Sequence, residues 1–190
     1  GRDMERDSYY TVATASQDLW DIDLIAKEAA KRAVNRLGSR VLKTQKSPVI
    51  FVAEEARSLI ASFIAAISGG ALYRKSSFLL DALGKPIFPD FMRIHEDPYL
   101  KRGLNSTPCD NDGVQTRRNE FIRGGVLQSY AMGTYSARQL GLQSTANSGG
   151  VFNIFVESAQ ALSFAQLLKK MDTGLLVTDL MGQGTNIVTG

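Results

Sequence analysis

The sequence predicts an α+β fold in which mixed and antiparallel sheets are flanked by helices. Short β-type runs and helical patterns follow one another irregularly along the 190 residues, and a Gly-Gly pair at 124–125 marks a hairpin turn. A doubly wound parallel sheet would instead show strands and helices in regular alternation. The chain is long enough for one large domain or two small ones with a buried core.

The clearest helix is expected between Asp21 and Gly38. Asp21 suits the N-cap, apolar residues then recur at helical spacing, and Gly38 suits a left-handed stop. Basic residues crowd the second half of this helix, where they solvate its outer face and complement the helix dipole. Nucleic-acid contact is the alternative interpretation of these charges. Residues 8–15, before the helix, are expected to form a short strand.

A second unit is expected to begin after a linker at 39–47. The run PVIFVA at 48–53 has the composition of a short strand, and EEARSLIASFIAAIS has one apolar face at helical spacing, with Gly69 as its stop. Residues 85–98 alternate apolar and polar side chains, but Pro86 and Pro89 favour an edge strand there.

The rest of the chain is expected to hold a hairpin and several short elements. The hairpin joins 114–123 to 126–132 through Gly124 and Gly125, whose positive φ angles suit a tight turn. The other predicted elements are a helix at 133–141, a strand at 151–158, a helix capped by Ser163 and Gln166, a strand at 175–182 and the start of a further strand in GQGTNIVTG.

Composition excludes several classes of protein. The chain has 22 Lys and Arg against 19 Asp and Glu, so its net charge of +3 gives little support to direct nucleic-acid binding. The longest apolar stretch, 59–67, is far shorter than a membrane span. Cys109 is the single cysteine, so an internal disulfide is excluded and a cytoplasmic location is the default.

No catalytic or metal-binding constellation is predicted in this chain. A zinc site needs three or four ligands, and the sequence offers one histidine, His95, and one cysteine, Cys109. His95 could act as a general base and Cys109 as a nucleophile, but packing or incidental roles are the simpler interpretations. The glycines of GQGTNIVTG favour bulges or close backbone approach, with ligand contact as the alternative.

Four stretches, in this order, resemble the TldD/PmbA family. They are ISGGALYRKSSFLLDALGKPI at 67–87, LNSTPCDNDGVQT at 104–116, GTYSARQLG at 133–141 and TGLLVTDLMGQGTN at 173–186. The resemblance is to the PmbA or TldE branch, the non-metal subunit type, whose members also carry the older label of modulators of DNA gyrase.

The resemblance implies a longer polypeptide of two parts, of which this chain is a fragment. Residues 1–43 would end an N-terminal α/β domain, and residues 44–190 would form the first half of a mostly β C-terminal domain. An unpaired strand edge in such a fragment is expected to promote self-association.

Catalytic members of the family carry HExxxH on the helix that follows a strand like PVIFVA, where two imidazoles bind zinc. In this chain the corresponding helix has Glu54 and Glu55 but no histidine. The resemblance therefore implies no catalytic residue and no metal here, with zinc only on a TldD-type partner.

The implied function is a non-catalytic subunit that pairs with a TldD-type zinc metalloprotease to cleave or process unfolded peptides. The alternative is a regulatory interaction protein that modulates DNA gyrase. No membrane partner is expected. The residues expected to contact the peptide or the partner subunit are Arg74, Lys75, Ser76, Thr107, Gly182 and Gly184.

Overall fold

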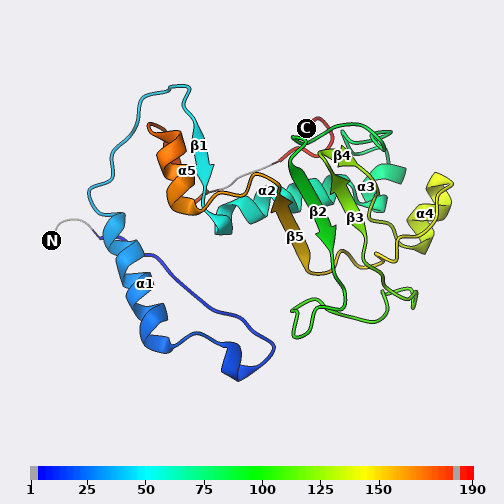
Figure 1. The fold of residues 1–190 in the computed structure, drawn as a ribbon, viewed down its shortest axis with the longest axis horizontal. Helices are drawn as coiled ribbons and strands as arrows, with labels where there is room; N and C mark the ends of the chain where they lie inside the picture. The colour runs from blue at the N-terminus through cyan, green and yellow to red at the C-terminus, as the bar shows by residue number, and fades with distance from the viewer. Residues whose placement is uncertain (1–3, 182–184) are drawn as a thin grey trace. The chain divides into compact units, whose positions relative to one another are not determined.

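The computed structural model describes residues 4–181 and 185–190, and the chain divides into two compact units, 1–46 and 47–190 (Figure 1). The elements are η1 (Ser16–Asp18), α1 (Ile22–Asn35), β1 (Val49–Phe51), α2 (Ala53–Ala66), α3 (Gly69–Tyr73), β2 (Met92–Glu96), β3 (Glu120–Arg123), β4 (Val126–Leu127), α4 (Thr134–Leu140), β5 (Ile154–Ser158), α5 (Phe164–Met171) and β6 (Leu175–Val177). The predicted α+β class is confirmed.

The first unit is built around α1, which begins as predicted. The Asp21 side chain accepts a hydrogen bond from the Asp23 amide at 2.8 Å and so caps the helix. The guanidinium of Arg32 lies 4.3 Å from the centroid of the Tyr9 ring, and that ring packs against Trp20.

The strand predicted at 8–15 is wrong. This segment has no strand assignment, and it is held by side-chain contacts rather than by a backbone ladder. Asp7 pairs with Arg36 at 3.2 Å, next to the contact between Tyr9 and Arg32. A β-type sequence becomes a strand only where a neighbouring strand accepts its hydrogen bonds, and the described part of the first unit offers none.

The second unit contains a four-stranded antiparallel sheet in the order β4-β3-β2-β5 (Figure 1). The strand expected at an edge because of Pro86 and Pro89 is β2, and it lies inside the sheet between β3 and β5. The prediction of an edge position is wrong because both prolines precede Met92, where the strand begins, so neither removes a hydrogen bond from its ladder.

The predicted hairpin is confirmed, although its strands are shorter than expected. β3 and β4 pair antiparallel with Ile122 opposite Leu127, and the turn is formed by Gly124 at φ +54° and Gly125 at φ +75°. Two successive positive φ values define the hairpin turn that glycine favours.

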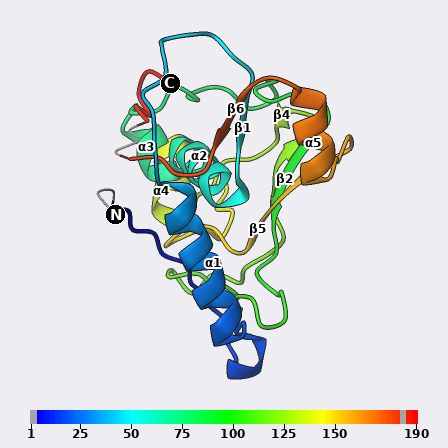
Figure 2. The same cartoon turned by 90° about the vertical axis from the view of Figure 1, so that its left-hand side faces the viewer.

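A separate two-stranded sheet joins distant parts of the chain. β1 and β6 pair in parallel, with Val49 opposite Leu175 and Phe51 opposite Val177, and the two strands lie side by side in Figure 2.

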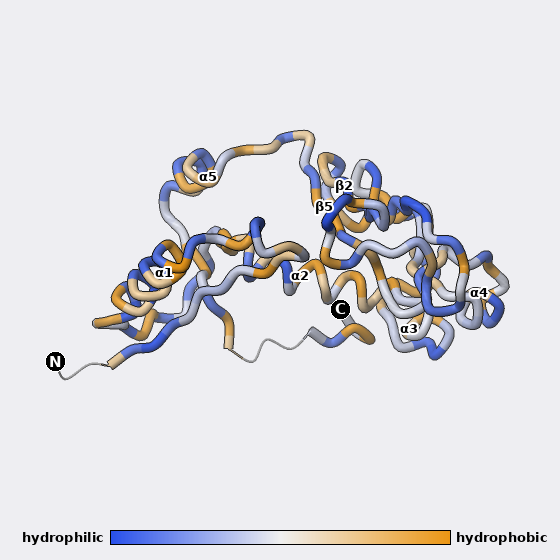
Figure 3. Tube along the Cα trace, turned by 90° about the horizontal axis from the view of Figure 1, so that it is seen from below, coloured by the Kyte–Doolittle hydropathy of each residue, from blue (hydrophilic) through white to orange (hydrophobic). Residues whose placement is uncertain are grey.

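The capping box predicted for α5 is present: Ser163 Oγ accepts from the Gln166 amide, and the Gln166 side chain accepts from the Ser163 amide. Hydrophobic and hydrophilic residues alternate along α5 (Figure 3).

The core of the second unit forms where α2 packs against the four-stranded sheet. Phe63 and Ile67 of this region join Ile94, Ile122 and Leu127 of the strands in one buried cluster. Fully burying a side chain of this size stabilises a fold by roughly 1.5–3 kcal/mol. The C-terminal part of the predicted apolar face, with Ile60 and Ile64 partly buried beside Phe63, therefore meets the core, whereas Leu59 stays exposed.

The sequence predicted that Gly69 would end α2, and this prediction is wrong. That helix ends at Ala66, and Gly69 begins α3, where its amide donates to the Ala131 carbonyl at 2.8 Å. A Cβ at this position would overlap the Ser136 side chain. Glycine is required here for close packing of α3 on α4 rather than for a helix stop.

The strand predicted to start in GQGTNIVTG is not present in residues 185–190. Residues 182–184 lie outside the described residues, and 185–190 form a turn in which the Gly190 amide donates to the Asn186 carbonyl. None of the helices in the described ranges has the length and apolar character of a membrane span.

Valine at the two hairpin glycines should destabilise the fold to different extents. A Cβ at Gly125 would overlap the carbonyl oxygen of Phe88, whereas a Cβ at Gly124 would meet only Asp90, at 3.7 Å. We expect G124V to cost about 1–3 kcal/mol from positive φ alone, and G125V to cost more. Urea unfolding followed by circular dichroism measures both, and equal losses would contradict this difference.

Candidate functional site

The strand–helix unit β1–α2 is where the resemblance places the family's zinc helix. β1 leads through Val52 into α2, and Glu54 and Glu55 occupy the first turn of the helix, where carboxylates favour the helix dipole. Within the residues that the structure describes, no three His, Cys, Asp or Glu side chains form a group that could hold a metal. The two hollows described next lie elsewhere in the second unit.

One of these surfaces is a hollow of about 390 Å³ beside Arg74, which we call the Arg74 groove. Its lining comes from the end of α2, from α3, from the start of α4 and from the loop at 147–151. Glycines make up much of the wall, so backbone groups are accessible there. The residues used below are Gly70, Tyr73, Arg74, Asp112, Tyr135 and Gly150.

Aromatic packing and a hydrogen bond position Arg74 in its groove. The guanidinium carbon lies 5.2 Å from the centroid of the Tyr73 ring, and Nη1 donates to the Tyr73 hydroxyl at 3.2 Å. Tyr73 in turn packs edge-on against Tyr135, with ring centroids 5.6 Å apart. A Cβ at Gly70 would come within 3.4 Å of Arg74 Nη1, so the glycine leaves space for the guanidinium.

Asp112 forms the opposite charge in the groove. Its carboxylate accepts from the Thr134 amide at 2.8 Å and from the Ser148 hydroxyl at 2.8 Å. The hydrogen bond from the Thr134 amide is the main cause that holds the pKa of Asp112 below its ordinary value. Asp112 therefore stays ionised at neutral pH and fixes the loop that carries Ser148.

The loop at 145–152 is anchored from beneath by the fully buried carboxylate of Glu96. Glu96 accepts hydrogen bonds from the side-chain amides of Asn119 and Asn147, at 2.6 and 2.9 Å, and from the backbone amide of Phe152 at 2.7 Å. Burial nevertheless raises the pKa of Glu96, because desolvation outweighs these hydrogen bonds. A single carboxylate thus joins β2, the start of β3 and the loop of the Arg74 groove.

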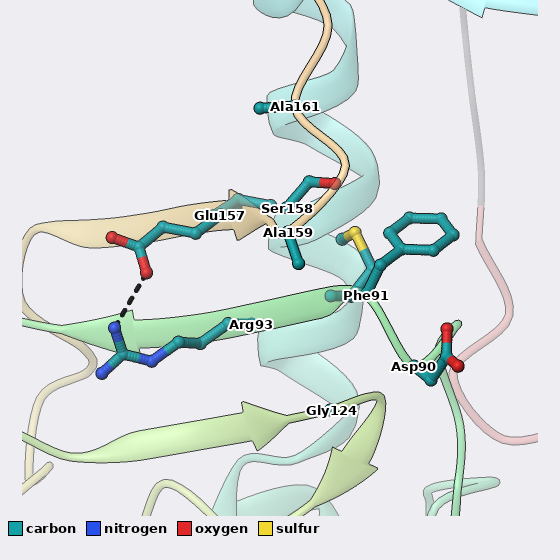
Figure 4. Close-up of a pocket in the computed structure, with 10 residues that line it drawn as sticks. Asp90, Phe91, Arg93, Gly124, Glu157, Ser158, Ala159 and Ala161 are labelled. Carbon is teal, nitrogen blue, oxygen red and sulfur yellow. Dashed lines mark hydrogen bonds and ion pairs between the residues drawn. The ribbon is translucent and has the colours of Figure 1, made fainter.

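A second hollow, of about 620 Å³, lies where β2 begins and β5 ends (Figure 4). Phe91 and Met92 line it at the start of β2, and Val156 and Ala159 line it at the end of β5. On this surface Arg93 pairs with Glu157 at 2.8 Å and also with Glu120 at 2.6 Å. The second hollow thus has an apolar lining beside a row of charges.

The second hollow lies next to an open sheet edge. β5 is the last strand in the order β4-β3-β2-β5. The Asp97 amide donates to Asn153 and the Ala159 amide donates to Phe91, so the odd-numbered residues of β5 face β2. The backbone groups of Ile154, Val156 and Ser158 consequently point away from β2, and no hydrogen bond from another described backbone group reaches them.

The structure separates the residues that the sequence analysis grouped as contacts. Arg74 lines the groove that bears its name, whereas Lys75, at φ +55°, and Ser76, whose hydroxyl donates to the Ala71 carbonyl, are not among its lining residues. Thr107 lies in another loop, where its hydroxyl donates to the Cys109 carbonyl. Gly182 and Gly184 lie outside the described residues.

His95 and Cys109 line neither of the two hollows. The His95 ring stacks on Phe155, with centroids 5.2 Å apart, and its Nε2 lies 3.4 Å from a Glu157 oxygen. Cys109 is exposed in the loop that bridges to Gln115. The contacts of His95 are those of a packed side chain.

Sequence reasoning missed Tyr73, Asp112, Tyr135 and the outer edge of β5. Asp112 was visible only as part of a polar loop, and nothing in its spacing indicated that it would reach Thr134 and Ser148. The edge position of β5 follows from the order of the strands, which the sequence does not reveal.

Comparison with known proteins identifies the family. A family model described as the PmbA/TldA metallopeptidase C-terminal domain matches residues 44–190, and the Metalloprotease PmbA of Escherichia coli O157:H7 is 49% identical over 188 residues. The chain belongs to the PmbA metalloprotease family. The alignment covers 99% of this chain but 42% of that PmbA, so the chain spans less than half the length of this curated relative.

Other relatives place the chain on the PmbA side of the family. A PmbA homolog of Haemophilus influenzae is 46% identical over 98% of this chain and 42% of its own length, whereas a TldD homolog of Buchnera aphidicola is 24% identical over 89% of this chain and 37% of its own length. The predicted resemblance to the PmbA branch of this family is therefore confirmed.

Solved structures of PmbA-type proteins share the fold. A candidate modulator of a DNA gyrase from Thermotoga maritima superposes with a TM-score of 0.87 at 31% identity, covering 97% of this chain and 44% of that one. TldE from Thermococcus kodakarensis superposes with a TM-score of 0.73 at 25% identity, covering 87% and 40%.

Replacing Glu96 should change how stability depends on pH. Its pKa is raised above the ordinary 4.5, so the native state binds more protons than the unfolded state between the two pKa values. The contribution of Glu96 is therefore fully present below the unfolded pKa and is lost as pH rises through the folded pKa. We expect the difference in unfolding free energy between wild type and E96Q to shift over this window, measured by urea unfolding from pH 4 to 8. A difference that is constant with pH would contradict it.

Proposed function

We propose that this chain is part of a longer, two-part PmbA-type subunit that pairs with a TldD-type zinc metalloprotease. In this proposal residues 1–43 end the N-terminal domain and 44–190 begin the C-terminal one. The partner supplies the zinc and cleaves unfolded peptides, while this subunit contributes walls, a partner interface and contacts to the peptide. Family membership and the names of the PmbA relatives support a role in proteolysis.

The open edge of β5 beside the second hollow is the observation that carries the peptide-binding part of the proposal. Ile154, Val156 and Ser158 present backbone donors and acceptors on the outer edge. An extended peptide can add to such an edge through main-chain hydrogen bonds, which read little of its sequence. The adjoining hollow, lined by Phe91 and Met92, can take an apolar side chain of the added strand (Figure 4).

The sequence of α2 supports placing the catalytic zinc on the partner. The only histidine of the chain is His95, on β2, and the first turn of α2 holds Glu54 and Glu55. Zinc hydrolases bind their metal through three protein ligands, most often with histidines among them. The helix that would carry the imidazoles in a catalytic member therefore lacks the side chains for that role.

We expect the purified chain to contain no stoichiometric zinc. Elemental analysis after dialysis against a weak chelator measures the metal content per chain. The variant H95Q, which removes the one histidine of the chain, is the matched control, because it should leave the metal content unchanged. One tightly held zinc per chain that is lost in H95Q would contradict the proposal.

Peptidase activity is expected only when the full-length subunit and a TldD-type protein are mixed. The measurement compares cleavage of an unstructured peptide by each protein alone and by both together. Full activity of the TldD-type protein alone would refute the supporting role. A pull-down with purified DNA gyrase runs beside this assay, and gyrase capture without activity in the mixture would favour the gyrase interaction that the names of related structures suggest.

Removing one outward amide from β5 should weaken peptide use by the mixture. V156P deletes the outward N–H of Val156 without removing a hydrogen bond to β2, whereas V156A keeps that N–H. We expect V156P to raise KM about fivefold, the value of one net hydrogen bond, while V156A changes it less. Equal effects of the two variants would show that the side chain, and not the strand edge, binds the peptide.

A further inference from the structure

We propose that the Arg74 groove binds a carboxylate group of the peptide, with Arg74 as the residue that pairs with it. This inference rests on the proposed role in peptide processing and adds the chemistry that the groove selects. It concerns a different surface from the edge of β5, because the two hollows share no lining residue.

Arg74 is a cation whose charge is not neutralised within its groove. Its guanidinium donates to the hydroxyl of Tyr73, and among residues 4–181 and 185–190 no carboxylate lies at ion-pair distance from it. Most of the nitrogens of the guanidinium therefore remain available as donors. A planar guanidinium matches a carboxylate in a two-point hydrogen bond, which is stronger than a bond between neutral groups.

The packing around Arg74 holds the guanidinium in place before a ligand arrives. Tyr73 lies beneath it, Tyr135 supports Tyr73 edge-on, and Gly70 leaves the space that it occupies. Restricting a long side chain in advance lowers the entropy that binding would otherwise cost. A solvated arginine on an open helix face would lack this aromatic support.

The glycine walls suit the main chain that accompanies a peptide carboxylate. Gly149 and Gly150 have φ of +93° and +129°, and a Cβ at Gly150 would meet no atom within 4 Å. A peptide backbone can therefore approach this wall at Gly150, whereas the Asn111 side chain packs against Gly149. The groove volume of about 390 Å³ is within the range of small-ligand sites.

Asp112 favours a ligand with a single negative charge over one with two. Its carboxylate lines the same groove and is ionised at neutral pH, so it repels an additional anion. A dianionic phosphate experiences more of this repulsion than a carboxylate does. Arg74, which has no ion-pair partner among the described residues, and an ionised Asp112 line the same groove. Together they favour a peptide carboxylate that is followed by uncharged main chain.

The carboxylate can come from the C-terminus of a peptide or from an acidic side chain, and binding experiments distinguish the two. Three Ala-Ser hexapeptides serve as probes: one with a free C-terminus, one with an amidated C-terminus and one amidated with a central Glu. Each is titrated into the isotope-labelled chain and followed by NMR shifts of the backbone amides. We expect shifts at Gly70, Gly149 and Gly150 with the carboxylate-bearing peptides.

Substitution of Arg74 tests the assignment. We expect R74Q to weaken binding of a carboxylate-bearing peptide about tenfold and to leave binding of the fully amidated, acid-free peptide unchanged, since a charge-assisted hydrogen bond is lost. R74K should restore part of the affinity. R138Q, in the exposed last turn of α4, is the matched control and should have no effect.

Two results would overturn the inference. One is an equal loss with R74Q for amidated and free-acid peptides, and the other is no loss for either. Because these titrations use the chain alone, a failure here leaves the test of subunit pairing unaffected. Likewise, inactivity of the mixed subunits would not erase a carboxylate site that the titrations detect.

Discussion

The buried carboxylate of Glu96 is the interaction on which the second unit depends. It receives hydrogen bonds from Asn119, which lies just before β3, and from Asn147 and the Phe152 amide, which both belong to the loop at 145–152. Without this acceptor the amide of the buried Phe152 would lose its partner, which costs more than the bond itself contributes. Asn119 and Asn147 would keep their bonds to the carbonyls of Thr145 and Gly150. The loop at 145–152 can keep its irregular course because the buried Glu96 side chain beneath it accepts these hydrogen bonds.

Both candidate surfaces follow from this anchor. Asn147 lines the Arg74 groove, and a few residues later the chain enters β5, where Val156 lines the second hollow. Phe152 lies between these two residues in the chain, and the bond from its amide to Glu96 fixes the backbone there. A fold whose glycine-rich segments are pinned in this way can present main-chain groups to a ligand without a large ordering cost.

Local chemistry explains which elements could be predicted from the sequence. The capping box of Ser163 and Gln166 and the hairpin at Gly124-Gly125 depend on neighbours in the chain, so they were recognisable and correct. The strand expected at 8–15 and the edge position of β2 depend on which segments become neighbours in space, and the sequence does not state this.

The candidate site was predictable to a smaller extent. Arg74 was named from its block of residues, but the reason for its position is Tyr73, Tyr135 and Gly70, which only the packing of α3 on α4 brings together. Glu96 carries no signal in the sequence, because a glutamate in a short strand is ordinarily exposed to solvent. Burial decided its importance, and burial is a property of the assembled fold.

The parallel pairing of β1 with β6 constrains how the chain reaches its final form. Val49 lies near the start of the second unit, whereas its partner Leu175 lies near the end and is synthesised much later. The hairpin of β3 and β4 can close as soon as its turn exists, whereas β1 must wait for nearly the whole unit to be synthesised. During that interval β1 has no partner strand, so its backbone edge is open to pairing with another chain as the protein emerges from the ribosome.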